Sequence, residues 1–240
     1  MRTINIARLN SWLAFLAPSR CVFCGDIADS AQICAPCRTA LPRIGSRCPH
    51  CALPTIHGEV CGACLTKKPP FAMTLAACRY TFPLDRLIQD FKYGKKLVLA
   101  KPLAHLLVDA YRERQADDFR PDILVAMPLS RSRQIERGFN QAQEIARNLA
   151  HTLRLPLINN ALVRTADAPK QATLPWRERH KNVRNAFACS SSVAGLHVAL
   201  IDDVMTSGAT ASAAAHELRR AGAVNVDIWV VARAVVNTVG

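Results

Sequence analysis

The chain beyond residue 70 alternates short apolar runs with stretches in which apolar residues recur every three or four positions. The apolar runs have the length of buried strands, at residues 73–81, 122–127, 161–164, 198–201 and 224–235. The periodic stretches are typical of amphipathic helices, at residues 83–92, 95–114, 140–153 and 209–221. Because alternating strands and helices are joined by right-handed crossovers, the pattern predicts an α/β fold with a mostly parallel sheet.

The segment after the strand at 198–201 combines two carboxylates with a loop of small residues. Asp202 and Asp203 come first, and the loop leads into a helix through Thr206, Ser207, Gly208, Ala209 and Thr210. Such a loop is suited to phosphate, because free backbone N–H groups and the helix dipole point at the anion. The carboxylates can accept hydrogen bonds from two sugar hydroxyls. An ordinary strand–helix turn with a hydroxyl cap is the alternative, but the combination favours a site for a phosphorylated sugar.

Eight of the ten cysteines form four Cys-x-x-Cys pairs, at Cys21/Cys24, Cys34/Cys37, Cys48/Cys51 and Cys61/Cys64. Two such pairs complete a tetrahedral zinc site, so the spacing predicts two structural Zn²⁺ ions. A disulfide scaffold is the alternative, but two-residue spacing throughout is more typical of metal. Sequential pairing would give a double zinc ribbon, and interleaved pairing fits the spacing as well.

The Thr-Lys-Lys-Pro-Pro stretch at 66–70 is a candidate linker. We therefore expect an N-terminal helix and zinc module over 1–70 and an α/β domain over 71–240. The short apolar stretch at 12–17 is interpreted as an amphipathic helix rather than a signal peptide. No run approaches the roughly 18 apolar residues that span a bilayer, and paired thiols suit a reducing compartment, so we expect a cytoplasmic protein without a membrane span.

The charge of the chain is strongly basic. The formal net charge of +13 treats the thiols as neutral. Eight thiolates and two Zn²⁺ ions would bring it to about +9, and most of the remaining excess lies in 71–240. A basic surface there suits polyphosphate or nucleic acid as a partner.

Three segments carry a family resemblance. Residues 126–141 contain Pro-Leu followed by Arg-Gly-Phe-Asn-Gln, which resembles a block of the ComF family. Residues 164–187 are similar to that family's Arg…Gln-x-x-Leu-x4-Arg-x-x-Asn stretch, and 198–210 resembles the phosphoribosyl pyrophosphate (PRPP) signature of type I phosphoribosyltransferases. With the cysteine pairs and the Phe-Lys-Tyr at 91–93, the resemblance covers nearly the whole chain. Ser207 stands where Thr is commoner, and it keeps the hydroxyl.

This resemblance implies a type I phosphoribosyltransferase-like sheet preceded by a double zinc ribbon. It implies PRPP as ligand together with Mg²⁺, with Asp202 and Asp203 at the ribose. Residues 164–185 would close over the site, and Arg179 is the first candidate there for substrate contact. The cations expected to meet pyrophosphate, from loops that flank the signature, are Arg131, Arg133 and Arg137. A solvated basic face is the alternative for each of these arginines.

Two functions fit these features. The first is a transferase, with Asp202, Asp203 and Arg179 as catalytic candidates, that joins a nucleophile to the ribose of PRPP and releases pyrophosphate. The second is a non-catalytic module that senses PRPP or handles single-stranded DNA. The family's association with competence implies a role near DNA uptake and utilisation, with single-stranded DNA or a protein of the competence machinery as partner. The sequence does not identify the acceptor nucleophile.

Overall fold

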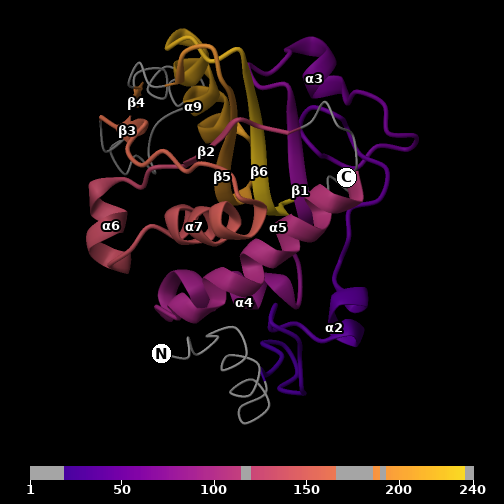
Figure 1. Cartoon of the computed structure of the whole chain (residues 1–240). Helices are drawn as coiled ribbons and strands as arrows, with labels where there is room; N and C mark the ends of the chain where they lie inside the picture. Colours follow the sequence, from indigo (N-terminus) through magenta and orange to yellow (C-terminus); the bar gives the residue numbers. More distant parts are fainter. Residues whose placement is uncertain (1–18, 115–119, 166–185, 190–192, 236–240) are drawn as a thin grey trace, which may run out of the picture. The chain divides into compact units, whose positions relative to one another are not determined.

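The computed structural model of the chain describes residues 19–114, 120–165, 186–189 and 193–235. Its backbone forms two compact units, Met1–Leu41 and Pro42–Gly240 (Figure 1). The first cysteine tetrad lies in the first unit, and the second tetrad lies in the unit that holds the α/β elements. The division into domains 1–70 and 71–240 stays a prediction, because it states which segments fold independently of each other. The expected helix at 12–17 lies outside the described residues.

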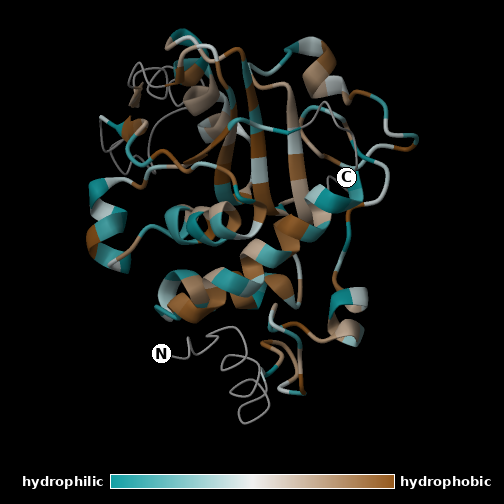
Figure 2. Ribbon diagram, in the orientation of Figure 1, coloured by the Kyte–Doolittle hydropathy of each residue, from teal (hydrophilic) through white to brown (hydrophobic). Residues whose placement is uncertain are grey.

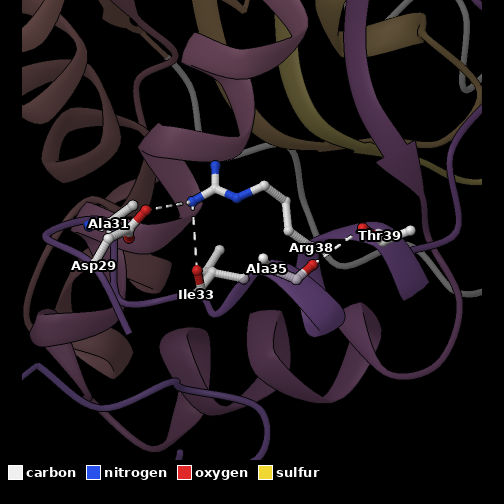
Figure 3. Close-up of polar contacts among 6 residues, drawn as sticks. All are labelled: Asp29, Ala31, Ile33, Ala35, Arg38 and Thr39. Atoms are coloured by element: carbon white, nitrogen blue, oxygen red, sulfur yellow. Dashed lines mark hydrogen bonds and ion pairs between the residues drawn. The ribbon is translucent and has the colours of Figure 1, made fainter. Parts of the chain in front are cut away.

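The described part of the first unit is a short ribbon followed by helix α2 (Ala35–Ala40). An antiparallel bridge joins Arg20 to Ile27 at the base of the first Cys-x-x-Cys turn. Figure 3 shows how polar contacts tie the ribbon to α2: the Arg38 guanidinium donates to an Asp29 carboxylate oxygen at 3.4 Å and to the Ile33 carbonyl at 3.5 Å. Among its described residues the buried apolar side chains besides the cysteines are Ala31, Ile33 and Leu41, so this part of the unit has a small core.

The main sheet of the second unit has the strand order β1-β6-β5-β2, and every neighbouring pair is parallel. Its strands are β1 (Met73–Arg79), β2 (Ile123–Ala126), β5 (His197–Met205) and β6 (Asn225–Arg233). A two-stranded antiparallel sheet is formed by β3 (Leu162–Arg164) and β4 (Phe187–Cys189). Apolar residues run along the central strands (Figure 2), as expected for strands that are covered on both faces. The predicted mostly parallel α/β sheet is confirmed.

Helices cover both faces of this sheet. Within the described residues of the second unit, the named α-helices are α3 (Gly62–Thr66), α4 (Leu84–Tyr93), α5 (Ala100–Arg114), α6 (Arg131–Arg137), α7 (Gln141–Leu153) and α9 (Ala209–Arg220). A 3-10 turn, η1 (Leu97–Leu99), precedes α5. The two longer helices α5 and α7 pack on each other and on the sheet (Figure 1). The crossover through α9 runs in the opposite direction along the sheet from the one through α5, so a right-handed connection places α9 on the other face. None of the helices in the described ranges is long and apolar enough to cross a bilayer.

Two local expectations need correction. Strand β5 continues to Met205, so Asp202 and Asp203 lie inside the strand rather than after its end. The arginines of the 131–137 segment, expected in a loop, lie on helix α6. Ser130 caps that helix by accepting a hydrogen bond from the Arg133 N–H. Because β2 and β5 pair in parallel, their carboxyl ends lie at the same edge of the sheet. Open α/β sheets bind ligands at this edge.

Candidate functional site

The paired cysteines form two clusters of thiols, Cys21/Cys24/Cys34/Cys37 and Cys48/Cys51/Cys61/Cys64, each with its sulfur atoms within 4.8 Å of one another. Two sulfur–sulfur distances are 3.6 Å, between Cys24 and Cys34, and 3.5 Å, between Cys51 and Cys61. A tetrahedral site with Zn–S bonds of 2.3 Å has edges of about 3.8 Å, so the donors fit zinc. All ten cysteines are free thiols. The pairing is sequential, which excludes the interleaved alternative.

Backbone amides support the thiolate form of the first cysteine in each cluster. Although burial raises the pKa of Cys21, N–H groups that include those of Cys34 and Cys24 donate to its sulfur and lower the pKa to about 6. The same balance lowers the pKa of Cys48 to about 6. Deprotonated sulfur is the form that binds metal. Four protein ligands leave no open coordination position, so both sites are suited to a structural ion.

A cavity of about 360 Å³ opens at the carboxyl ends of β2 and β5. Its lining brings together most residues predicted for phosphate and ribose, namely Asp202, Asp203, Thr206, Ser207, Gly208, Ala209, Thr210, Arg133 and Arg137. Arg131 is exposed on α6 and is not part of this lining, and Arg179 lies outside the described residues. A second cavity, beside Cys189 and Glu217, has neither the hydroxyl loop nor the acidic pair.

The loop at 206–208 makes a tight turn between β5 and α9. Gly208 has a φ of 79° in the left-handed region and stands immediately before α9. A Cβ atom at this position would meet only the flexible end of the Met205 side chain, so the positive φ is what favours glycine. The Ser207 hydroxyl accepts a hydrogen bond from the Ala209 N–H at 3.3 Å. The first N–H groups of a helix have no partner within it, so the turn offers donors to an anion at the cavity.

The two carboxylates of the site differ in their surroundings. Asp203 is only 6% exposed, and its Oδ1 forms an ion pair with the Lys92 Nζ at 2.9 Å. The Asp202 Oδ1 accepts the Asp203 N–H at 2.8 Å. Burial and, second, the neighbouring Asp203 charge together raise the pKa of Asp202 to about 7, against the opposing effects of the Asp203 N–H, Lys92 and Arg133. The Asp202 carboxyl therefore titrates near neutral pH.

Lys92 is a site residue that periodicity alone did not indicate. It lies in the last turn of α4, within the Phe-Lys-Tyr segment, and it reaches the acidic pair from an element far away in the sequence. The signal that could have identified it is a basic residue at the edge of a buried helical stripe, four positions after Ile88. Such a lysine lies at the rim of the core, where it can meet a buried carboxylate.

The Arg-Gly-Phe-Asn-Gln block forms the turn between α6 and α7. Gly138 ends α6 in the left-handed region, and Asn140 caps α7 by accepting the Gln143 N–H at 3.3 Å. The Arg137 guanidinium lies over the Tyr93 ring at 5.3 Å and donates to the Gln141 Oε1 at 2.8 Å. These contacts fix a nearly buried arginine at the cavity wall, so the block has a structural reason for each of its polar residues.

On the side of β3 the cavity is lined by Arg164, whose guanidinium lies over the Phe187 ring at 5.4 Å. The chain enters the predicted closing segment immediately after this strand. Its remaining candidates lie outside the described residues.

The sequence matches two domain families. Residues 12–65 match the double zinc ribbon domain, and residues 99–237 match the phosphoribosyl transferase domain. The chain is 35% identical to the DNA utilization protein YhgH of Salmonella typhimurium, over 84% of this chain and 90% of that protein. It is 30% identical to competence protein F of Haemophilus influenzae, over 90% and 97%. Competence protein ComFC of Bacillus subtilis is 28% identical, over 80% and 79%.

Solved structures with a related fold are more distant. Adenine phosphoribosyltransferase is 17% identical with a TM-score of 0.37, over 57% of this chain and 73% of that one. Glutamine PRPP amidotransferase from B. subtilis is 18% identical with a TM-score of 0.37, over 53% and 25%.

Proposed function

Because this chain belongs to the ComF family, which joins a double zinc ribbon to a phosphoribosyl transferase domain, we propose that its α/β part binds PRPP with Mg²⁺ and acts near DNA uptake and utilisation. One observation carries the proposal: a single cavity holds the hydroxyl loop, the acidic pair and three arginines, Arg133, Arg137 and Arg164. Each group has a counterpart on a phosphorylated sugar that carries a pyrophosphate.

The proposed division of labour follows from the charges. The loop at 206–210 would hold the sugar phosphate through backbone N–H groups and hydroxyls. Asp202 and Asp203 would accept hydrogen bonds from the ribose hydroxyls, while Arg133 and Arg137 meet the pyrophosphate. Carboxylate oxygens are the ligands that Mg²⁺ prefers, so the acidic pair also fits this ion, which would neutralise pyrophosphate charge. Lys92 forms an ion pair with Asp203 and offsets its charge.

A transferase at this site would break the bond between the anomeric carbon and the pyrophosphate oxygen. Pyrophosphate would leave with the bonding electron pair, the acceptor nucleophile would form the new bond, and the acceptor's proton would be lost to solvent or base. Arg133 and Arg137 can stabilise the charge that develops on the leaving group. Arg179 and the segment that contains it are proposed to close over this reaction.

A measurement of pyrophosphate release tests this proposal directly. The full-length protein is incubated with PRPP, Mg²⁺ and a panel of acceptors that includes single-stranded DNA. Release that depends on one acceptor class supports a transferase, whereas PRPP binding without release supports the non-catalytic sensing role. A protein that neither binds nor turns over PRPP contradicts both.

We expect PRPP affinity to fall as the pH falls below neutral. Asp202 must be ionised to accept hydrogen bonds from two donors, and its pKa in the free protein is about 7. Protonation therefore competes with binding, and affinity should drop about tenfold between pH 8 and pH 6. Calorimetry across this range gives the profile. Asp202→Asn is the control, because any pH dependence left in that variant belongs to the ligand phosphates; an equal slope in both proteins would contradict the assignment.

Single-stranded DNA is expected to compete with PRPP for the arginines of α6. Phosphate contacts release counterions, so log affinity should fall with log salt by about 0.7 per neutralised phosphate. Filter binding across salt concentrations, with and without PRPP, measures both effects. Arg133→Met should lower the slope, and Arg112→Met, on the exposed side of α5, should not. DNA binding that does not depend on the salt concentration, or that persists at saturating PRPP, would show that DNA binds another surface.

A further inference from the structure

Arg233, the last residue of β6, connects the second zinc cluster to the phosphate loop. Its side chain is buried, with the residue 3% exposed. The Nε donates to the Cys51 carbonyl at 2.8 Å, and one terminal nitrogen donates to the Met205 carbonyl at 3.0 Å and also to the Thr206 carbonyl. The same nitrogen donates to the carbonyl of Ala234 at 2.6 Å. One guanidinium therefore joins the backbone of a zinc ligand to the start of the loop.

The partners of Arg233 are unusual for a buried cation. The ion pairs with carboxylates among the described residues do not include it, so backbone carbonyls and the nearby sulfurs of Cys51, Cys61 and Cys64 compensate for the loss of water. Lysine could not replace it, because only the planar guanidinium presents donors in several fixed directions. A buried charge without its partners is costly, so the contacts to Cys51 and to the loop must form together.

The contacts also set the direction of the loop amides. In a planar trans peptide the C=O of one residue and the N–H of the next point in opposite directions. The Met205 carbonyl also accepts a hydrogen bond from the Ala234 N–H at 2.9 Å, so the sheet shares in fixing it. The Thr206 carbonyl is held toward Arg233, which turns the Ser207 N–H away from the guanidinium. A loop whose N–H groups are fixed before the ligand arrives needs less ordering when it binds an anion.

The second ribbon is anchored to the sheet independently of Arg233. A His50 ring nitrogen is paired with the Ala72 carbonyl at 2.7 Å, and the Arg47 guanidinium donates to the Ala76 carbonyl at 3.4 Å. The zinc cluster at Cys48–Cys64 thus belongs to the same compact unit as the loop. The cluster at Cys21–Cys37 belongs to the other unit and serves as an internal comparison.

We propose that Arg233 is a positioning residue through which the second zinc ribbon holds the phosphate loop in its anion-binding conformation. This inference rests on the proposed function of the loop. It makes the loop sensitive to the metal state of Cys48, Cys51, Cys61 and Cys64. Loss of zinc there releases the Cys51 carbonyl, then Arg233, and then the loop, whereas loss of zinc from the first cluster leaves the loop unchanged.

Hydrogen exchange in the zinc-loaded, full-length protein tests the proposal without PRPP. Arg233→Met should speed exchange of the amides at 206–210 at least tenfold, with both zinc ions retained. Arg233→Lys should behave like Arg233→Met, because a lysine cannot reach both sets of carbonyls. Arg79→Met is the matched control, since Arg79 occupies the paired register position on β1 but is exposed, and it should leave the loop unchanged.

Zinc-site variants give the second arm. Cys61→Ser with Cys64→Ser should speed exchange in the loop, and Cys21→Ser with Cys24→Ser should not. Unchanged loop exchange in Arg233→Lys and in the Cys61/Cys64 variant overturns the proposal. PRPP affinity, measured on the same proteins, should fall about tenfold in Arg233→Lys. If the wild-type protein binds no PRPP, the proposed function fails, but the exchange rates still test the role of Arg233. If Arg233→Met does not fold, the exchange rates of Arg233→Lys test that role.

Discussion

Replacing Asp202 and Asp203 together by asparagine is expected to weaken PRPP binding at least about 100-fold. Each carboxylate would lose a hydrogen bond to a ribose hydroxyl, and bonds to charged groups contribute about 1.5–3 kcal/mol each. Calorimetry on the folded, zinc-loaded variant measures the loss. The variant without PRPP should keep the thermal midpoint of the wild type, because burial disfavours the ionised form of Asp202. A carboxyl whose pKa is raised on folding lowers the free energy of unfolding as the pH rises from about 4 toward 7.

The matched control for this variant is Asp85→Asn with Asp90→Asn. It removes the same charge from α4, outside the cavity lining, and Asp90 pairs with the exposed Lys96 at 2.7 Å. Exposed ion pairs contribute little to stability, so this control should bind PRPP normally. Unchanged affinity in the Asp202/Asp203 variant would refute the ribose assignment. A collapse of apo stability would instead make the acidic pair a structural partner of Lys92.

Loss of either cysteine tetrad is expected to unfold the ribbon that it holds. Structural zinc contributes about 10–16 kcal/mol of apparent binding free energy, and small modules with few buried apolar side chains cannot replace it. Cys48→Ser with Cys51→Ser should also lower the thermal midpoint of the sheet, because this ribbon contacts β1 and β6 through Arg47 and Arg233. Metal analysis and circular dichroism measure both effects.

The control here is Cys189→Ser, which removes a thiol outside both tetrads and should keep two zinc ions per chain. Fewer than two zinc ions in a well-folded wild-type chain would contradict the assignment. The variants also separate the two ribbons, since loss of the first tetrad should leave the midpoint of the α/β elements unchanged.

The parallel strands and the helix after Gly208 were predictable because their signals are local. Apolar runs mark β2, β5 and β6, and Asn140 marks the start of α7. Helix α6 was not predictable from periodicity, since Ile135 is the one apolar residue in its seven positions and it is exposed. Its only local signals were the cap residues Ser130 and Gly138.

The parts of the site that escaped prediction depend on contacts between distant segments. Asp203 lies inside β5, where its buried carboxylate pairs with Lys92 on α4, and no local pattern encodes that pair. The attachment of the second ribbon to the loop depends likewise on Arg233, whose partners are backbone carbonyls. Backbone atoms carry no sequence signature, so a sequence gives no sign of such a connection.

The central claim is that the cavity at 202–210 is a PRPP site, and calorimetry of PRPP against the full-length zinc-loaded protein tests it most directly. We predict one PRPP bound per chain, with affinity that depends on Mg²⁺ and is lost in Asp202→Asn with Asp203→Asn. Absence of binding at millimolar PRPP with Mg²⁺, in a protein that carries both zinc ions, would contradict it.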